Sequence, residues 1–359
     1  MNIKNRLSSG FVSLLAAMLA LNAGQVVAQG PVAIGNADFS DPANGGSIGG
    51  LLGPDIVSQP IGAGPWLGTS LGVLGLLARP TLSIDPGQQS ASLSGLLGIN
   101  VAGILNNRGW FSQTLGESWQ FGRFYVLSAD ITTGSSLDLG LLSGSNTGIA
   151  LTAAGAPIAS STTAPATLTE LTLLGGNAYR LRFGYLADIA ASGFIGVRLF
   201  SEPQGVLGAS LLPGISFTGT VELEGRDVGP AAEIVIDTYS GDLQAQVGQP
   251  LGNPIIAIVR DGDGDGVPGL MVRISAPLAG ASADLTAPSS SDPPGRVITA
   301  RSDLDGLVVF FATANDIAGC YRITVEPVDA SLGLNPAVFH MRNWSTDPAQ
   351  DSIYCNGYQ

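Results

Sequence analysis

The sequence has few of the residues on which catalysis and metal binding usually depend. Its 359 residues include one histidine, His340, two cysteines and a single lysine, Lys4. A Ser-His-Asp triad would have to use His340, which stands in an apolar run. One histidine beside two cysteines also disfavours a zinc site. We therefore expect a protein that is not an enzyme.

Acidic residues are the one catalytic type in good supply, with 28 Asp and Glu in the chain. Most of them stand beside turns, whereas few, such as Asp130, Glu170 and Glu222, fall in expected strands. A pair of carboxylates facing each other in a cleft could still hydrolyse a glycosidic bond. A secreted hydrolase with an unrecognised site is therefore kept as an alternative.

Positive charge is also scarce. Lys4 and Arg6 lie at the N-terminus, and the other 13 of the 15 basic residues are all arginine. The formal net charge is −13. Binding to phosphate backbones needs a basic footprint, so we expect no nucleic-acid partner.

Long apolar runs are missing except at the N-terminus. Lys4 and Arg6 precede an apolar run over 11–21, and the segment ends in Val26-Val27-Ala28, with small residues at the −3 and −1 positions. This order is typical of a secretory signal peptide cut after Ala28, so we expect residues 1–28 to be removed and the protein to be exported. A membrane anchor is the alternative, but the run is shorter than the ~20 residues that span a bilayer. We expect no membrane insertion.

The remaining chain is rich in turn residues and in alternating apolar runs. It holds 50 glycines and 22 prolines, and the mean hydropathy is +0.32. Strand-like runs with turn signals every 8–15 residues are typical of β-sandwiches. A Gly/Pro/charge cluster at 225–232 interrupts the pattern. We predict an all-β protein with a first domain at 29–224, a linker at 225–232 and a second domain at 233–359.

Residues 239–327 carry an ordered series of motifs. An SGD-x-Q start is followed by a strand at 255–259, an Asp/Gly-rich turn, Pro268-Gly269, a strand at 271–274, a TARSDLDG hairpin and a closing Gly-x-Tyr-x-Ile-Thr-Val. The region resembles the bacterial immunoglobulin-like domains of the invasin/intimin group. That resemblance implies an immunoglobulin-like β-sandwich that serves as a stalk or interaction module.

The first domain carries short motifs of its own. It opens on Asn-x-Asp-Phe, continues through Ser-Gln-x-Leu and Tyr-x-Leu-x-Ala-Asp, and closes on Phe-x-x-x-Val-x-Leu. The residues are Asn36, Asp38, Phe39, Ser112, Gln113, Leu115, Tyr125, Leu127, Ala129, Asp130, Phe217, Val221 and Leu223. This domain resembles galactose-binding-like jelly rolls, which include carbohydrate-binding modules. Ser40 and Thr218 stand where calcium-binding members carry acids, so the resemblance does not extend to that site.

Aromatic and amide residues supply the candidate ligand site. Trp66 follows a Gly-rich segment, and Trp110 follows Asn106, Asn107 and Arg108. Exposed indole rings can stack on sugar faces while amide and guanidinium groups bind hydroxyls. We expect a glycan-binding platform at these five residues; burial of the rings in the core is the alternative.

The acidic turn DGDGDG at 261–266 is the candidate metal site. Asp261, Asp263 and Asp265 match the opening of a calcium loop, but Val272 stands where the twelfth-position Glu would be. Either the turn binds calcium or it is a solvated hairpin turn. No other cofactor is expected.

Two cysteines, Cys320 and Cys355, lie in the second domain. In an exported protein an even pair most often forms a disulfide, which would tie the last strands to the C-terminal segment.

These patterns together predict a bacterial surface, periplasmic or secreted binding protein. The first domain would bind a polysaccharide or surface protein, and the second would act as a stalk in cell adhesion. A structural surface or matrix protein without a small ligand is the second reading.

Overall fold

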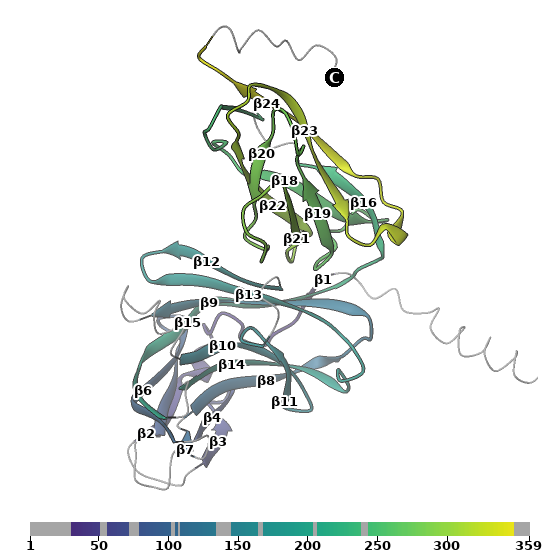
Figure 1. Cartoon of the computed structure of the whole chain (residues 1–359). Helices are drawn as coiled ribbons and strands as arrows, with labels where there is room; N and C mark the ends of the chain where they lie inside the picture. The colour runs from purple at the N-terminus through teal and green to yellow at the C-terminus, as the bar shows by residue number, and fades with distance from the viewer. Residues whose placement is uncertain are drawn as a thin grey trace, which may run out of the picture. The chain divides into compact units, whose positions relative to one another are not determined.

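The fold is described from a computed structural model (Figure 1). The described residues are 30–50, 56–71, 79–101, 105–106, 108–133, 145–163, 168–203, 207–237 and 243–347. The expected signal peptide therefore lies outside the described residues. From Pro31 on, the chain forms one unit by its contacts.

Within the described residues, strands β1 to β15 form two sheets, in which the strands from β2 on pair antiparallel with one another. One runs β12-β13-β9-β15-β6-β5-β2, with β1 on β15 and β7 on β6, and the other runs β11-β10-β14-β8-β4-β3. Their bounds are β1 Gly30–Val32, β2 Gly46–Gly50, β3 Ile56–Pro60, β4 Leu67–Leu71, β5 Arg79–Asp85, β6 Ser90–Val101, β7 Leu105–Asn106, β8 Arg108–Ser118, β9 Arg123–Thr133, β10 Ser145–Ala153, β11 Ala156–Ser160, β12 Thr169–Gly175, β13 Ala178–Leu186, β14 Phe194–Pro203 and β15 Leu207–Asp227.

Both sheets contribute to a single core, which makes this part a β-sandwich. Along β8, buried and partly exposed residues alternate from Arg108 to Leu115. Successive side chains of a strand point to opposite faces, so this alternation places one set in the core and the other outside. The core includes Leu82, Leu127, Phe183 and Phe217 from one sheet and Phe111, Ile149, Val197 and Leu199 from the other.

The last nine strands form a second sandwich. One sheet runs β16-β18-β22-β20 and the other β17-β24-β23-β19-β21; of the strand pairs in these described sheets, only β17 with β24 is parallel. Their bounds are β16 Ala231–Ile236, β17 Gln244–Gln246, β18 Ile255–Asp261, β19 Met271–Ser275, β20 Ala283–Thr286, β21 Val297–Arg301, β22 Leu307–Ala314, β23 Gly319–Pro327 and β24 Ala337–Trp344. A separate core includes Ile255, Val272, Phe310, Ile323 and Phe339.

Besides the strands, the described residues hold two short 3₁₀ helices, η2 (Pro42–Asn44) and η5 (Ala330–Leu332). Within that part of the chain no helix has the length and apolarity to cross a bilayer.

The turn before β22 requires glycine. Gly306 has φ +80°, and a Cβ there would lie 2.6 Å from the carbonyl oxygen of Val259. Both the left-handed backbone and the close approach exclude larger residues. This glycine fixes the turn at 303–307, which carries Asp303 and Asp305.

The predicted all-β sandwich class is confirmed. The strands expected at 255–259 and 271–274 appear as β18 and β19, one or two residues longer. The interruption expected at 225–232 is shorter, because β15 continues to Asp227 and β16 begins at Ala231. The domain limits themselves stay a prediction.

Candidate functional site

Trp66 lies in the core of the first sandwich and not on its surface. Its side chain is fully buried, its ring lies 5.5 Å from that of Phe39, and its indole N–H donates to the Asn36 carbonyl oxygen at 3.1 Å. A ring with no exposed surface cannot stack on a sugar. The expectation of a ligand platform at Trp66 is therefore corrected to a structural role.

Trp110 lies on the outward side of β8. Gly109 and Phe111 on either side are buried, whereas Trp110 is half-buried, so its ring is on the face opposite the core. Its cross-strand partners are Phe200 on β14 and Thr69 on β4. Because Trp110 lies on the outer face, its place in a glycan-binding platform stays a prediction.

Two arginines contact the Trp110 ring. The guanidinium carbon of Arg198 lies 4.6 Å from the ring centroid and that of Arg108 lies 5.6 Å from it. Arg198 also donates to the Gly155 carbonyl oxygen at 2.8 Å. Cations within about 6 Å of an indole centroid are attracted by its quadrupole, so the three side chains form an ordered cluster.

The two predicted asparagines are less well defined. Asn106 ends β7 and pairs with Asn100 of β6. Asn107 lies outside the described residues. Their part in a ligand site stays a prediction.

The acidic turn at 261–266 is organised around Asp261. Its carboxylate Oδ1 accepts from the backbone N–H of Asp263 at 3.0 Å and of Asp265 at 2.9 Å, and Oδ2 accepts from Gly229 N–H at 2.9 Å. Burial acts to raise the pKa of Asp261, but these N–H groups and that of Gly264 outweigh it and lower the pKa. Asp261 thus joins the turn to the connection between the sandwiches.

The described residues include no group of three or more His, Cys, Asp or Glu placed to hold a metal ion. Asp263 is exposed and Asp265 is half-buried. Calcium binding at Asp261, Asp263 and Asp265 stays a prediction. His340 lies on β24 with an exposed side chain, as expected for a surface strand residue.

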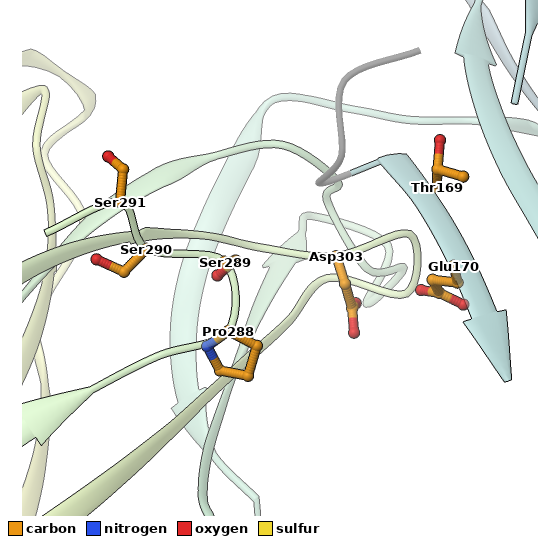
Figure 2. Close-up of a pocket in the computed structure, with 7 residues that line it drawn as sticks. All are labelled: Thr169, Glu170, Pro288, Ser289, Ser290, Ser291 and Asp303. Carbon is orange, nitrogen blue, oxygen red and sulfur yellow. The ribbon is translucent and has the colours of Figure 1, made fainter. Parts of the chain in front are cut away.

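A cleft of about 360 Å³ contains two acids that the sequence did not bring together (Figure 2). Glu170 of β12 and Asp303 line it with Thr169 and the Pro288–Ser291 segment. Burial raises the pKa of both carboxyl groups. Like charge from Asp303 and Asp305 raises the pKa of Glu170 further, and like charge from Asp305 raises that of Asp303. Strand position had singled out Glu170, whereas Asp303 lies in the TARSDLDG motif, which was interpreted only as a hairpin.

Both acids have structural partners. Arg182 donates to Glu170 at 2.8 Å and also to both oxygens of Asp305, at 3.0 and 3.2 Å. Asp303 accepts from the backbone N–H of Asp305 and Leu307. The carboxylates therefore hold the turn and the ion pairs in place, which accounts for them without a catalytic role.

Leu304, between Asp303 and Asp305, adds an apolar contact to these ion pairs. It is fully buried against Phe124 and Val126 of β9, and Arg226 donates to its carbonyl oxygen. A fully buried leucine contributes roughly 1.5–3 kcal/mol relative to an exposed one. The cleft lies beside this apolar contact.

No family model matches the chain, and no curated protein matches it. Among solved structures, the D0-D1 domain of intimin is similar at 9% identity, covering 69% of this chain and 96% of that chain, with a TM-score of 0.22. The Yersinia pseudotuberculosis adhesin InvE is similar at 11% identity, with coverage of 69% and 58% and a TM-score of 0.22.

The adhesin domain of Epf from Streptococcus pyogenes is similar at 11% identity over 89% of this chain and 98% of that chain, with a TM-score of 0.26. Of the InvE structure, this chain covers only 58% of the length.

Proposed function

We propose that the protein is an exported, non-enzymatic binding protein of the adhesin type. Its first sandwich recognises a glycan or another surface polymer through the outward side of β8, and its second sandwich serves as a stalk or interaction module. The single observation that supports this most is the half-buried Trp110 with Arg108 and Arg198 against its ring.

The chemistry of this cluster suits a sugar polymer. An indole presents an apolar surface that matches the C–H face of a sugar ring. Guanidinium groups are planar donors that bind hydroxyl and carboxylate oxygens. Because the arginines hold the ring in one orientation, little side-chain entropy is lost when a ligand stacks on it.

The experiment is a glycan-array and polysaccharide pull-down screen of the full exported chain, with and without calcium. The test variant is Trp110→Ala, and the control is Phe121→Ala, because Phe121 is an exposed aromatic residue (77%) outside the cluster. We expect saturable binding that Trp110→Ala weakens about tenfold, which corresponds to about 1.4 kcal/mol. Phe121→Ala should bind as the original protein does.

Two results would overturn the proposal: no glycan binding by the folded protein, or equal binding by Trp110→Ala. The first would leave the structural surface or matrix protein as the better reading. A hydrolase is not favoured, because Glu170 and Asp303 both serve the structure.

Export and the disulfide belong to the same proposal. Cys320 lies on β23 and is not a free thiol, whereas Cys355 lies outside the described residues. The pairing of the two, the signal peptide at 1–28 and both family resemblances stay predictions.

A further inference from the structure

Strand β12 ends the nine-stranded sheet (Figure 1). Within the described part of the chain it pairs with β13 alone, in an antiparallel register from Thr169–Phe183 to Gly175–Ala178. Along the other side of an edge strand, alternate residues present backbone N–H and C=O groups that no neighbour pairs. β12 therefore offers a template for another strand.

Its side chains are apolar and exposed. Leu171, Leu173 and Leu174 are 46%, 62% and 50% exposed. Leu171 and Leu173 stand opposite the buried Leu181 and Tyr179, so they belong to the core-facing side of the sheet. Leu171 and Leu173 form an apolar row that the described part of the sandwich leaves exposed, whereas Leu174 lines a hollow with Thr172 and Glu222 on the opposite face of the sheet.

A hollow adjoins this row. Its volume is about 200 Å³, and its lining is Ile131, Thr147, Ser161, Thr162, Thr169, Leu171, Tyr179 and Leu181. Since Leu171 forms part of its wall, an apolar side chain placed beside Leu171 could enter it.

Few of the features that usually protect an edge strand from pairing are present in β12. Its sequence, TELTLLG, holds no lysine and no proline. The one charged residue, Glu170, is bonded to Arg182 at 2.8 Å and is only 26% exposed on its side chain. Edge strands commonly use such charges, prolines or bulges to prevent pairing, and here only a bulge after Leu173 remains.

We propose that β12 pairs with β12 of a second copy of this chain, antiparallel, about a two-fold axis at Thr172. In this register the side chains of β12 are complementary to those of β12 in the second copy. Leu171 lies opposite Leu173 of the second copy, and Thr172 lies opposite its counterpart. No two like charges face each other, and apolar cross-strand pairs stabilise a sheet.

We expect this pairing to be weak, because β12 can bury only a small surface against its counterpart. Stable dimers bury roughly 800 Å² on each partner, and one seven-residue strand supplies less. The net charge of −13 adds repulsion between copies, which salt screens. The structure thus points to association that rises with concentration, as suits copies crowded on a surface.

Sedimentation velocity of the full exported chain over a range of concentrations, in about 0.15 M salt, tests the pairing. The test variant is Leu173→Lys and the control is Ile189→Lys, which changes a 92% exposed residue away from β12. We expect the original protein and Ile189→Lys to shift towards dimer together, and Leu173→Lys to stay monomeric with an unchanged melting temperature. Equal association of the two variants would overturn the proposal.

A cysteine at the axis tests the register. In Thr172→Cys two copies place their new thiols directly opposite, with Cα atoms about 4.5–5.5 Å apart, which is within the range of roughly 4.4–6.8 Å that disulfides span. Mild oxidation should give a covalent dimer many times faster than in Ile189→Cys. Equal rates would contradict the register. Neither measurement involves a glycan, so the result is independent of the proposed function.

Discussion

Two aspartate turns of the second sandwich have the same local structure and opposite electrostatics. Asp261 accepts from the N–H groups two and four residues further on, at 3.0 and 2.9 Å. Asp303 does the same, from Asp305 at 3.0 Å and Leu307 at 2.8 Å. Yet the pKa of Asp261 is lowered and that of Asp303 is raised.

The surroundings explain the difference. Burial raises the pKa of both carboxyl groups, but Asp261 has further donors, chiefly the N–H of Gly229, and these outweigh burial. At Asp303 burial prevails over its two donors, and the nearby Asp305 carboxylate adds to the increase while Arg182 opposes it. The number of N–H donors, more than the turn itself, decides which form of the acid the fold prefers.

The largest expected effect comes from Asp261→Ala. It leaves three backbone N–H groups without their acceptor, one of them in the connection between the sandwiches. Hydrogen bonds to charged groups contribute roughly 1.5–3 kcal/mol each, but water can replace those on the exposed side of the turn, so we expect a loss of about 3 kcal/mol. Urea unfolding measures it.

The matched control is Asp263→Ala in the same turn, where the side chain is exposed. We expect a change within about 0.5 kcal/mol. If both variants lost the same stability, Asp261 would have no special role as an acceptor.

The sequence predicted the strands well because the signal is local. β18 alternates buried and half-buried residues along its whole length, and such a period of two is visible in the residues themselves. The length of β15, from Leu207 to Asp227, was not predicted, because glycines and a proline inside it read as breaks.

The site was harder to predict because it depends on contacts between distant residues. Trp66 and Trp110 both follow polar or Gly-rich segments, and only the packing against Phe39 and the bond to Asn36 separate the buried ring from the surface one. The cleft joins Glu170 on β12 to Asp303 in the turn before β22, two positions far apart in sequence. No local pattern carries that information.

A smaller effect is the pH dependence, which should have opposite signs at the two turns. The lowered pKa of Asp261 gives stability that is present above its usual value of 3.8 and is lost as the pH falls through the folded-state pKa. The raised pKa of Asp303 gives stability that is full below 3.8 and is lost as the pH rises through the folded-state pKa.

Unfolding of Asp261→Asn and Asp303→Asn between pH 3 and 7 measures these contributions as differences from the original protein. Relative to its variant, the original should gain stability with rising pH in the first case and lose it in the second, by on the order of 1 kcal/mol each. Arg182, Glu170 and Asp305 face Asp303 and are kept in both proteins, so their own titration largely cancels. Slopes of the same sign would contradict the comparison.

The smallest effect concerns calcium at the first turn. A site with a dissociation constant of about 1 mM, as in extracellular modules, would add about 0.65 kcal/mol at about 2 mM calcium. Both oxygens of Asp261 already accept backbone N–H groups, and the turn is satisfied without a cation. We therefore expect calorimetry to give the same melting temperature with calcium as with a chelator, in the original protein and in Asp263→Ala alike. A calcium-dependent increase that Asp263→Ala removes would instead establish the metal site, and the two aspartate turns would then differ in ligand as well as in charge.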